Sequence, residues 1–407
     1  MGNAKELYER GISSPGDKYV CWKCFGDYAI KEFIKNEAKY LSCDYCKGTS
    51  RNKPIAAHIN DVIEFILDGI ETEWGDPANS MSYESKEGGY IGTVTDIYSL
   101  LSEIDLGIDN DNLFDDIAKS VTKTEWCEID PYGLTPQEEW YYDWEEFSVQ
   151  VKHHVRYVFF NIPQNEVEQH NIKKQPYEVL AKIGEIANEL GLIRNLSKKS
   201  TIFRCRNNKA DEKFTSVDEL GPPSAHEAKY ANRMSPAGIP MFYGSFDEET
   251  AILETHDEDH EFTTVAAFDT LKSFRVLDLN KIPAIPSLFD QSNNYKRPII
   301  IFMRLFLNDL SKPIDKKDRA HIEYVPTQVV TEYFRHIFRD ENGEPIKGIL
   351  YPSSRNSGGV SCVLFIEKEY CIQDNIKREF EYTWQKVEAF LSMDSSSIRV
   401  KRINPKP

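Results

Sequence analysis

Two cysteine pairs near the start of the chain have the spacing of a metal site. Cys21 and Cys24 form one Cys-x-x-Cys pair, and Cys43 and Cys46 form a second pair after an interval of 18 residues. Each such turn directs two thiolates at one ion, and two turns complete a closed tetrahedron of the kind that zinc adopts in structural sites. The spacing therefore predicts a structural zinc ion that these four cysteines bind.

A second set of residues could act on a phosphorylated ligand. Arg204 and Arg206 occupy alternate positions of an expected strand, so both side chains project to the same face. Guanidinium groups are planar and bind phosphate in a bidentate manner, so two neighbouring arginines can bind a diphosphate. The sequence leaves open which of the two enters a site.

Two further segments supply a carboxylate, a tyrosine and hydroxyl groups. A Ser-Pro-Ala-Gly loop follows Arg233 and leads into a short apolar strand that ends at Tyr243. Glu254 comes eleven residues later, among the apolar residues of an expected helix. A Ser/Gly-rich turn nearer the C-terminal end offers the hydroxyls of Ser353 and Ser354. Each residue taken alone fits a structural role, so the argument depends on their combined order.

Together these segments resemble the RES domain, a family named for an arginine, a glutamate and a serine. The run 233–238 (Arg-Met-Ser-Pro-Ala-Gly) resembles the Arg-Trp-Asn-Pro-x-Gly loop of the family, with Met and Ser in place of Trp and Asn. Tyr243 and Glu254 follow this loop at the family spacing, and the run 351–353 resembles its late Tyr-Pro-Ser motif. The resemblance covers about residues 200–370.

The N-terminal half is similar to the HEPN-like segment that precedes RES in some bacterial proteins, including a Cys-x-x-Cys-Phe-Gly-Asp opening. HEPN ribonucleases use an arginine followed by a histidine at four to six residues. The candidates here are Arg51 and His58, and Pro54 between them argues against the interior of a helix.

The resemblance implies a fold like that of ADP-ribosyltransferases and an enzyme that cleaves the nicotinamide–ribose bond of NAD⁺, as a glycohydrolase or a phosphorylase. It also implies a role as a bacterial toxin or phage-defence effector. An antitoxin, another regulatory protein and a second copy of the chain are the partners that such a role suggests. Three alternatives stay open: a protein ADP-ribosyltransferase, a non-catalytic module that senses NAD⁺ or ADP-ribose, and a HEPN ribonuclease.

The resemblance also implies a role for each site residue. Glu254 is expected to stabilise the ribosyl cation, and Arg233 to bind the diphosphate with one of the two strand arginines. Tyr243 is expected to stack on the nicotinamide. Ser353, favoured over Ser354, is expected to orient the ribose or the carboxamide. The motif does not identify the acceptor of ADP-ribose.

The elements that must position these residues differ between the two halves. Recurrence of apolar residues at three and four positions predicts helices in the N-terminal half, at 59–70, 95–104, 113–121 and 138–160. The last of these, rich in Trp and Tyr, is expected in the core of the N-terminal domain. A further helix is expected at 176–192. The C-terminal half has short runs typical of strands, at 201–205, 241–243, 263–268, 275–279, 299–305, 349–351 and 360–366. Helices are expected among them at 248–255 and 326–338.

The predicted fold class is α+β. A helical N-terminal domain with a zinc ribbon is expected at 1–160, a linker and helix at 161–198, and a mixed α+β RES domain at 199–372. The remaining 373–407 are expected to form a C-terminal helix and a solvated basic tail.

Composition limits the function classes further. The net charge of -17 repels phosphate backbones and disfavours nucleic-acid binding. There is no apolar run of about 18 residues, so no membrane span is expected. The N-terminus has no secretory signal, and the eight cysteines are too few for a disulfide-rich scaffold. We therefore expect a cytoplasmic protein.

Overall fold

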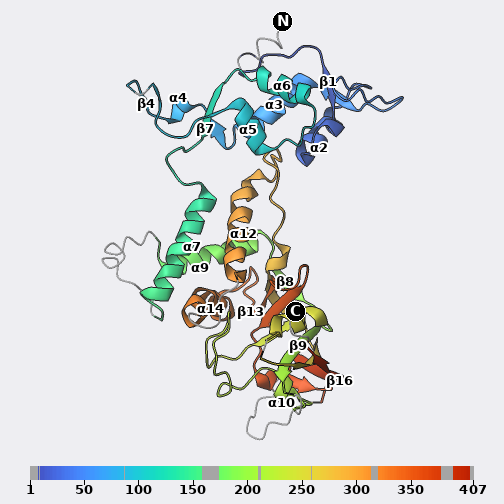
Figure 1. Cartoon of the computed structure of the whole chain (residues 1–407), viewed down its shortest axis with the longest axis vertical. Helices are drawn as coiled ribbons and strands as arrows, with labels where there is room; N and C mark the ends of the chain where they lie inside the picture. Colours follow the sequence, from blue (N-terminus) through green and yellow to red (C-terminus); the bar gives the residue numbers. More distant parts are fainter. Residues whose placement is uncertain are drawn as a thin grey trace. The chain divides into compact units, whose positions relative to one another are not determined.

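The computed structural model describes residues 8, 10–86, 88–157, 174–209, 212–257, 259–312, 320–376 and 388–403. The chain divides into two compact units (Figure 1). The first comprises Met1–Gln137 and Ala284–Pro298, and the second comprises Glu138–Pro283 and Ile299–Pro407. Within the described residues, no helix is both long enough and apolar enough to cross a membrane.

The first unit is a set of short helices and strands around one apolar core. Its longest helix, α3 (Ile59–Ile70), buries a face that recurs at three and four residues, as the sequence predicts. Side chains at the N-caps of several helices accept hydrogen bonds from the first turn, for example Asp27 and Asp96. The other elements are β1 (Tyr19–Cys21), η1 (Trp22–Cys24), α2 (Tyr28–Glu37), β2 (Ala56–His58), β3 (Trp74–Gly75), α4 (Pro77–Ser80), β4 (Tyr83–Glu84), β5 (Gly89–Tyr90), β6 (Thr95–Asp96), α5 (Ile97–Ile104), α6 (Asp111–Ser120), β7 (Glu125–Glu128) and η4 (Asn294–Lys296).

The second unit is built on a nine-stranded sheet. The strand order is β15-β16-β11-β9-β10-β14-β13-β12-β8, and the neighbours are antiparallel except for the pairs β15–β16 and β12–β13. The strands are β8 (Ile193–Leu196), β9 (Thr201–Asn208), β10 (Phe242–Ser245), β11 (Phe262–Thr270), β12 (Phe274–Asp278), β13 (Ile346–Pro352), β14 (Val360–Leu364), β15 (Cys371–Gln373) and β16 (Leu391–Arg402).

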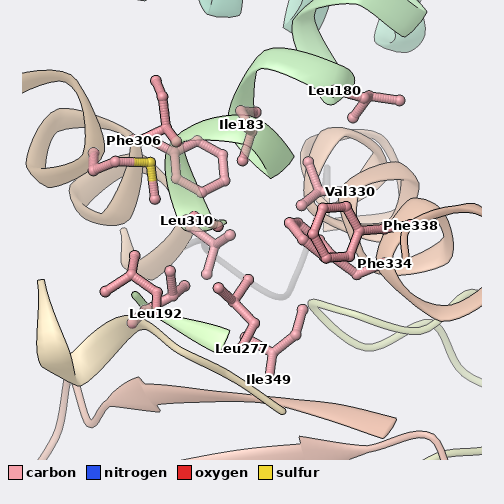
Figure 2. Close-up of a cluster of buried hydrophobic side chains, with 14 of the residues drawn as sticks. Leu180, Ile183, Leu192, Leu277, Phe306, Leu310, Val330, Phe334, Phe338 and Ile349 are labelled. Carbon is pink, nitrogen blue, oxygen red and sulfur yellow. The ribbon is translucent and has the colours of Figure 1, made fainter. Parts of the chain in front are cut away.

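Helices pack against this sheet through a large apolar core. Figure 2 shows Ile183, Phe306 and Phe334 pointing from helices toward Leu277 and Ile349 of the sheet. The helical elements of this unit are α7 (Pro136–His153), α9 (Pro176–Glu189), α10 (Val217–Leu220), α11 (Glu248–Thr255), η3 (Leu279–Lys281), α12 (Arg297–Ser311), α13 (Ala320–Glu323), α14 (Val325–Glu332), the π-turn η5 (Tyr333–Ile337) and η6 (Lys368–Tyr370).

The strand predicted at 299–305 is wrong, because these residues lie in helix α12. Its buried residues include Ile299, Ile300, Met303 and Phe306, which recur at helical spacing. A proline at the second position of the helix is compatible with its first turn. The run of isoleucines favours a strand by propensity, but burial of one helical face outweighs that preference.

The position of the aromatic helix also differs from the prediction. Trp144, Phe147 and Val151 of α7 are buried in the core of the second unit, with residues of α9 and α12, and not in the N-terminal unit. The compact units divide the chain near residue 137. The end of the predicted helix at 158–160 and the linker at 161–173 lie outside the described residues.

Within the described part of the C-terminal segment, Leu391–Arg402 form strand β16, whereas a solvated tail was expected there. Strand β16 pairs with β11 over most of its length. Its basic residues are held in ion pairs, because Arg399 and Lys401 contact the carboxylate of Glu248 and Arg402 contacts that of Glu261. Residues 377–387 and Lys406 lie outside the described residues.

Candidate active site

A cavity of about 430 Å³ opens beside the central strands of the second unit. Strands β9 and β10, the C-terminal end of α11, and residues of β13 and β14 contribute to its lining, as does the loop that leads into β10. The volume lies near the lower end of the range for pockets that hold a small ligand. Glu254, Tyr243 and Arg204, from three separate elements, line this one cavity.

Glu254 lies in the last turn of α11, and the sequence fixes the N-terminal end of this helix. Asp247 caps the N-terminus, because its carboxylate accepts a hydrogen bond of 2.7 Å from the backbone N–H of Thr250. Glu248 and Glu249 occupy the first turn, where the helix dipole favours negative charge. Glu254 is half-buried, and its Oε1 accepts a hydrogen bond from the hydroxyl of Ser353.

Ser353 follows β13 in a turn that holds its hydroxyl in one orientation. Its Oγ donates to Glu254 and accepts from the backbone N–H groups of Arg355 (3.1 Å) and Asn356 (3.0 Å). The amide of Asn356 in turn donates to the hydroxyl of Thr250 in α11 at 2.8 Å. The neighbouring Ser354 is exposed, so of the two serines it is Ser353 that contacts the carboxylate.

Tyr243 lies in β10 with its ring largely enclosed. Its hydroxyl is 2.9 Å from the hydroxyl of Ser235 in the preceding loop. Burial raises the pKa of Tyr243 to about 12, so the phenol is neutral at ordinary pH. Burial likewise raises the pKa of the neighbouring Tyr351 well above its usual value. The cavity therefore combines a carboxylate with neutral aromatic walls.

The two strand arginines have different surroundings. Arg204 lines the cavity and donates to the carbonyls of Leu220 (2.8 Å) and Tyr243 (2.7 Å). Burial lowers the pKa of Arg204. Arg206 is exposed, donates to the carbonyl of Glu219 and is absent from the cavity lining.

Arg233 is not among the residues that line the cavity. Its guanidinium donates to the carbonyls of Leu310 (2.7 Å) and Lys312 (2.9 Å), where α12 ends and leaves carbonyls without helical partners. Its loop neighbours Asn232 and Ser235 do line the cavity. Arg233 therefore contacts the site through its loop and not through its guanidinium.

Several polar residues of the cavity were not identified from the sequence. Asn207 lines it and donates to the carbonyl of Thr255 at 2.9 Å, which joins β9 to the end of α11. Ser245 and Ser361 lie opposite each other on β10 and β14, with their hydroxyls 3.1 Å apart. For Ser361, its position within the otherwise apolar strand β14 was the available signal.

The four predicted metal ligands converge in the first unit. The Sγ atoms of Cys21, Cys24, Cys43 and Cys46 all lie within 4.8 Å of one another. Three of the separations are 3.4, 3.6 and 3.8 Å. A tetrahedron of thiolates about 2.3 Å from zinc has edges of about 3.8 Å, so this arrangement fits the ion. The other four cysteines, Cys127, Cys205, Cys362 and Cys371, are buried.

His58, the candidate HEPN residue, has a structural role in the described fold. It caps the N-terminus of α3, where its Nδ1 accepts a hydrogen bond of 3.2 Å from the backbone N–H of Asn60. Its Nε2 is 3.2 Å from the carboxylate of Asp17. Both ring nitrogens are therefore engaged locally.

Two family models match the chain. HEPN/RES N-terminal domain 1 matches residues 36–165, and the RES domain matches residues 201–385. No curated protein and no solved structure matches it.

Proposed function

Because the chain carries a HEPN/RES N-terminal domain and a RES domain, we propose that it cleaves the nicotinamide–ribose bond of NAD⁺, as a glycohydrolase or a phosphorylase. The observation that carries this proposal is the position of one carboxylate group in the cavity. Glu254 lines a cavity with Arg204 and Tyr243 and is hydrogen-bonded to Ser353. A fixed carboxylate beside a small cavity suits a reaction that develops positive charge on a sugar.

In the proposed reaction the bond between the ribose carbon and the nicotinamide nitrogen breaks, and nicotinamide leaves with the electron pair. The ribose carbon becomes cationic, and the carboxylate of Glu254 stabilises that charge in a site shielded from water. A water oxygen, which gives up a proton to the solvent, or an anionic phosphate oxygen then bonds to the same carbon. The products are nicotinamide and either ADP-ribose or its phosphate adduct.

The contacts support distinct roles for the other residues. The Ser353 hydroxyl orients Glu254 and, in this proposal, a ribose hydroxyl. Tyr243 offers a neutral face for the nicotinamide ring. Arg204 supplies the positive charge of the cavity. The hydrogen bonds of Arg233 support a positioning role, in which it fixes the loop that carries Ser235.

The direct test compares two variants of the same helix. Nicotinamide release from NAD⁺ should fall by about two orders of magnitude or more in Glu254→Gln, because the neutral amide removes the charge that stabilises the cation. Glu249→Gln is the matched control, because Glu249 is exposed on the same helix and its loss should leave the rate unchanged.

The outcomes of this assay with different acceptors distinguish the proposed enzyme from the alternative functions. No nicotinamide release by the wild type with water, phosphate or protein acceptors would contradict the enzymatic proposal. Binding of NAD⁺ without turnover would indicate a sensing module, and a labelled protein product would indicate a protein ADP-ribosyltransferase. RNA cleavage lost in His58→Ala would indicate the ribonuclease.

We propose that the biological role is that of a toxin or phage-defence effector, since unrestrained cleavage of NAD⁺ removes an essential cofactor. Expression of the wild type in bacteria should arrest growth as cellular NAD⁺ falls. The Glu254→Gln variant should permit growth, and equal arrest by both proteins would contradict this role.

We also propose that Cys21, Cys24, Cys43 and Cys46 bind a structural zinc ion. The convergence of four thiol groups with zinc-like separations supports it. Metal analysis of the purified protein should find about one zinc per chain, and a preparation that is folded without bound metal would contradict the proposal.

A further inference from the structure

A second cavity, of about 530 Å³, adjoins the candidate active site. Pro223, Ile239 and Pro240 line both cavities, so the two share a wall. The rest of the second cavity is formed by the loop before β10, by η5 and by η6. Its lining includes two cationic residues, Arg335 and Lys368.

Arg335 is a candidate anion-binding residue whose side chain is fixed in position. Its side chain is only 13% exposed, and one of its terminal nitrogens contacts the carboxylate of Glu367. A guanidinium has five N–H donors, so this single ion pair leaves donors for a ligand. Lys368 lies nearby, and its Nζ is 3.7 Å from a carboxylate oxygen of Asp218 and 3.8 Å from one of Glu227.

The lining of this cavity carries both signs of charge, because Glu367 and Glu369 accompany Arg335 and Lys368, and further cations lie close to Arg335. Burial lowers the pKa of Lys347, and the charges of Arg335, Lys272 and Arg339 lower it further. Positive groups that destabilise one another's charge are stabilised by an added anion. The second cavity therefore lies beside a group of neighbouring cations that also contact carboxylates.

The first cavity alone is poorly suited to the whole substrate. Its volume of about 430 Å³ is at the lower end of the range for one small ligand, whereas NAD⁺ contains two nucleotides joined by a diphosphate. Among its described lining residues, Arg204 is the one cation, and Glu254 and Asp257 are anionic. The nicotinamide riboside half fits that charge pattern better than the phosphates do.

We propose that the dinucleotide crosses the shared wall, so that its adenylate half occupies the second cavity, with Arg335 and Lys368 as phosphate ligands. This inference rests on the proposed function and adds a subsite to it. Planar guanidinium binds phosphate oxygens in a bidentate manner, and the lysine supplies a second point charge.

Calorimetric titrations with two fragments of the substrate test the subsite. In a Glu254→Gln background, ADP and nicotinamide riboside are titrated separately. Arg335→Ala should weaken ADP binding by about tenfold or more, because a charged hydrogen bond is lost. Binding of nicotinamide riboside should be unchanged, since that fragment has no phosphate and lies in the first cavity.

Two further variants separate ligand contact from structural support. Glu367→Gln breaks the same ion pair but keeps the cation, so ADP should bind as tightly as before or more tightly. Arg335→Lys keeps the charge and should retain part of the affinity. ADP binding that is unchanged in Arg335→Ala and in the double variant with Lys368→Ala would overturn the inference, as would equal loss of both fragments. Cleavage of NAD⁺ by the wild type would leave the proposed function standing in either case.

Discussion

At the scale of single residues, the arrangement of Glu254 depends on a partner 99 positions away in the sequence. The Ser353 hydroxyl can donate only one hydrogen bond, and two backbone N–H groups already direct hydrogen bonds at its oxygen. Its proton is therefore directed to the carboxylate. A carboxylate fixed in this way needs little reorganisation when a sugar cation forms beside it.

Substitution of Arg233 distinguishes a structural role for this residue from a role in binding the diphosphate. Arg233→Ala removes two hydrogen bonds to the carbonyls at the end of α12, so the free energy of unfolding should fall by about 1 to 3 kcal/mol. Thermal melting measures this loss. A raised KM for NAD⁺ with unchanged melting would instead support the diphosphate-binding role that the RES resemblance implies. Arg206→Ala is the control, because Arg206 is exposed.

The sequence predicted part of this site for a physical reason. Glu254, Tyr243, Ser353 and one arginine were identifiable because a motif preserves residue types at fixed spacings, and the structure brings them to neighbouring positions. Asn207 was not identifiable, because its place in the cavity depends on strand order and register, which a motif does not encode. The hydrogen bonds of Arg233 also depend on the end of a helix that was predicted to be a strand.

At the scale of elements, the immediate surroundings of the cysteine pairs are small, although Val20, Phe25 and Ala57 pack into the core of the first unit. Strands β1 and β2 pair over only three residues, and η1 is a single turn. The apolar cluster beneath the thiols contains just three buried residues, two of them cysteines. Two short strands of this kind are marginal in water without further support.

Removal of zinc should therefore unfold this segment before the rest of the protein. With a strong chelator, or in Cys43→Ser, hydrogen exchange should rise first over residues 19–58, because the binding energy of the ion is folding energy there. The strands of the nine-stranded sheet should keep their protection. Uniform protection after complete loss of zinc would contradict a structural role.

The elements that the sequence predicted well are those in which pattern and propensity agree. Helix α3 has a clean recurrence of buried residues and matches its predicted bounds. Helix α12 has consecutive isoleucines whose propensity conflicts with their spacing, and it was predicted as a strand. Strand β16 is stabilised by pairing with β11 and by ion pairs, which are long-range contacts that local patterns do not reveal.

At the scale of the whole molecule, the two compact units are not consecutive in the chain. The chain leaves the second unit after Pro283, contributes residues 284–298 to the first, and returns at Ile299. Leu288 and Phe289 of this segment are buried in the core of the first unit. No sequence pattern marked this exchange, because a short apolar pair in a polar loop does not indicate which core will bury it.

Phe289 should therefore contribute to the stability of the first unit, although it lies far in the sequence from the rest of that unit. Its ring is 2% exposed and lies against Gly69, where even a Cβ would come within 2.4 Å of the ring. Phe289→Ala should destabilise the first unit by about 3 to 5 kcal/mol, because it empties a close-packed site. Scanning calorimetry, which resolves units that unfold separately, should show the lower melting in one transition only. Tyr295→Ala in the same segment is the matched control, because that ring is 61% exposed and its removal should leave both transitions in place. An unchanged transition in Phe289→Ala would mean that the segment does not contribute to the stability of that core in solution.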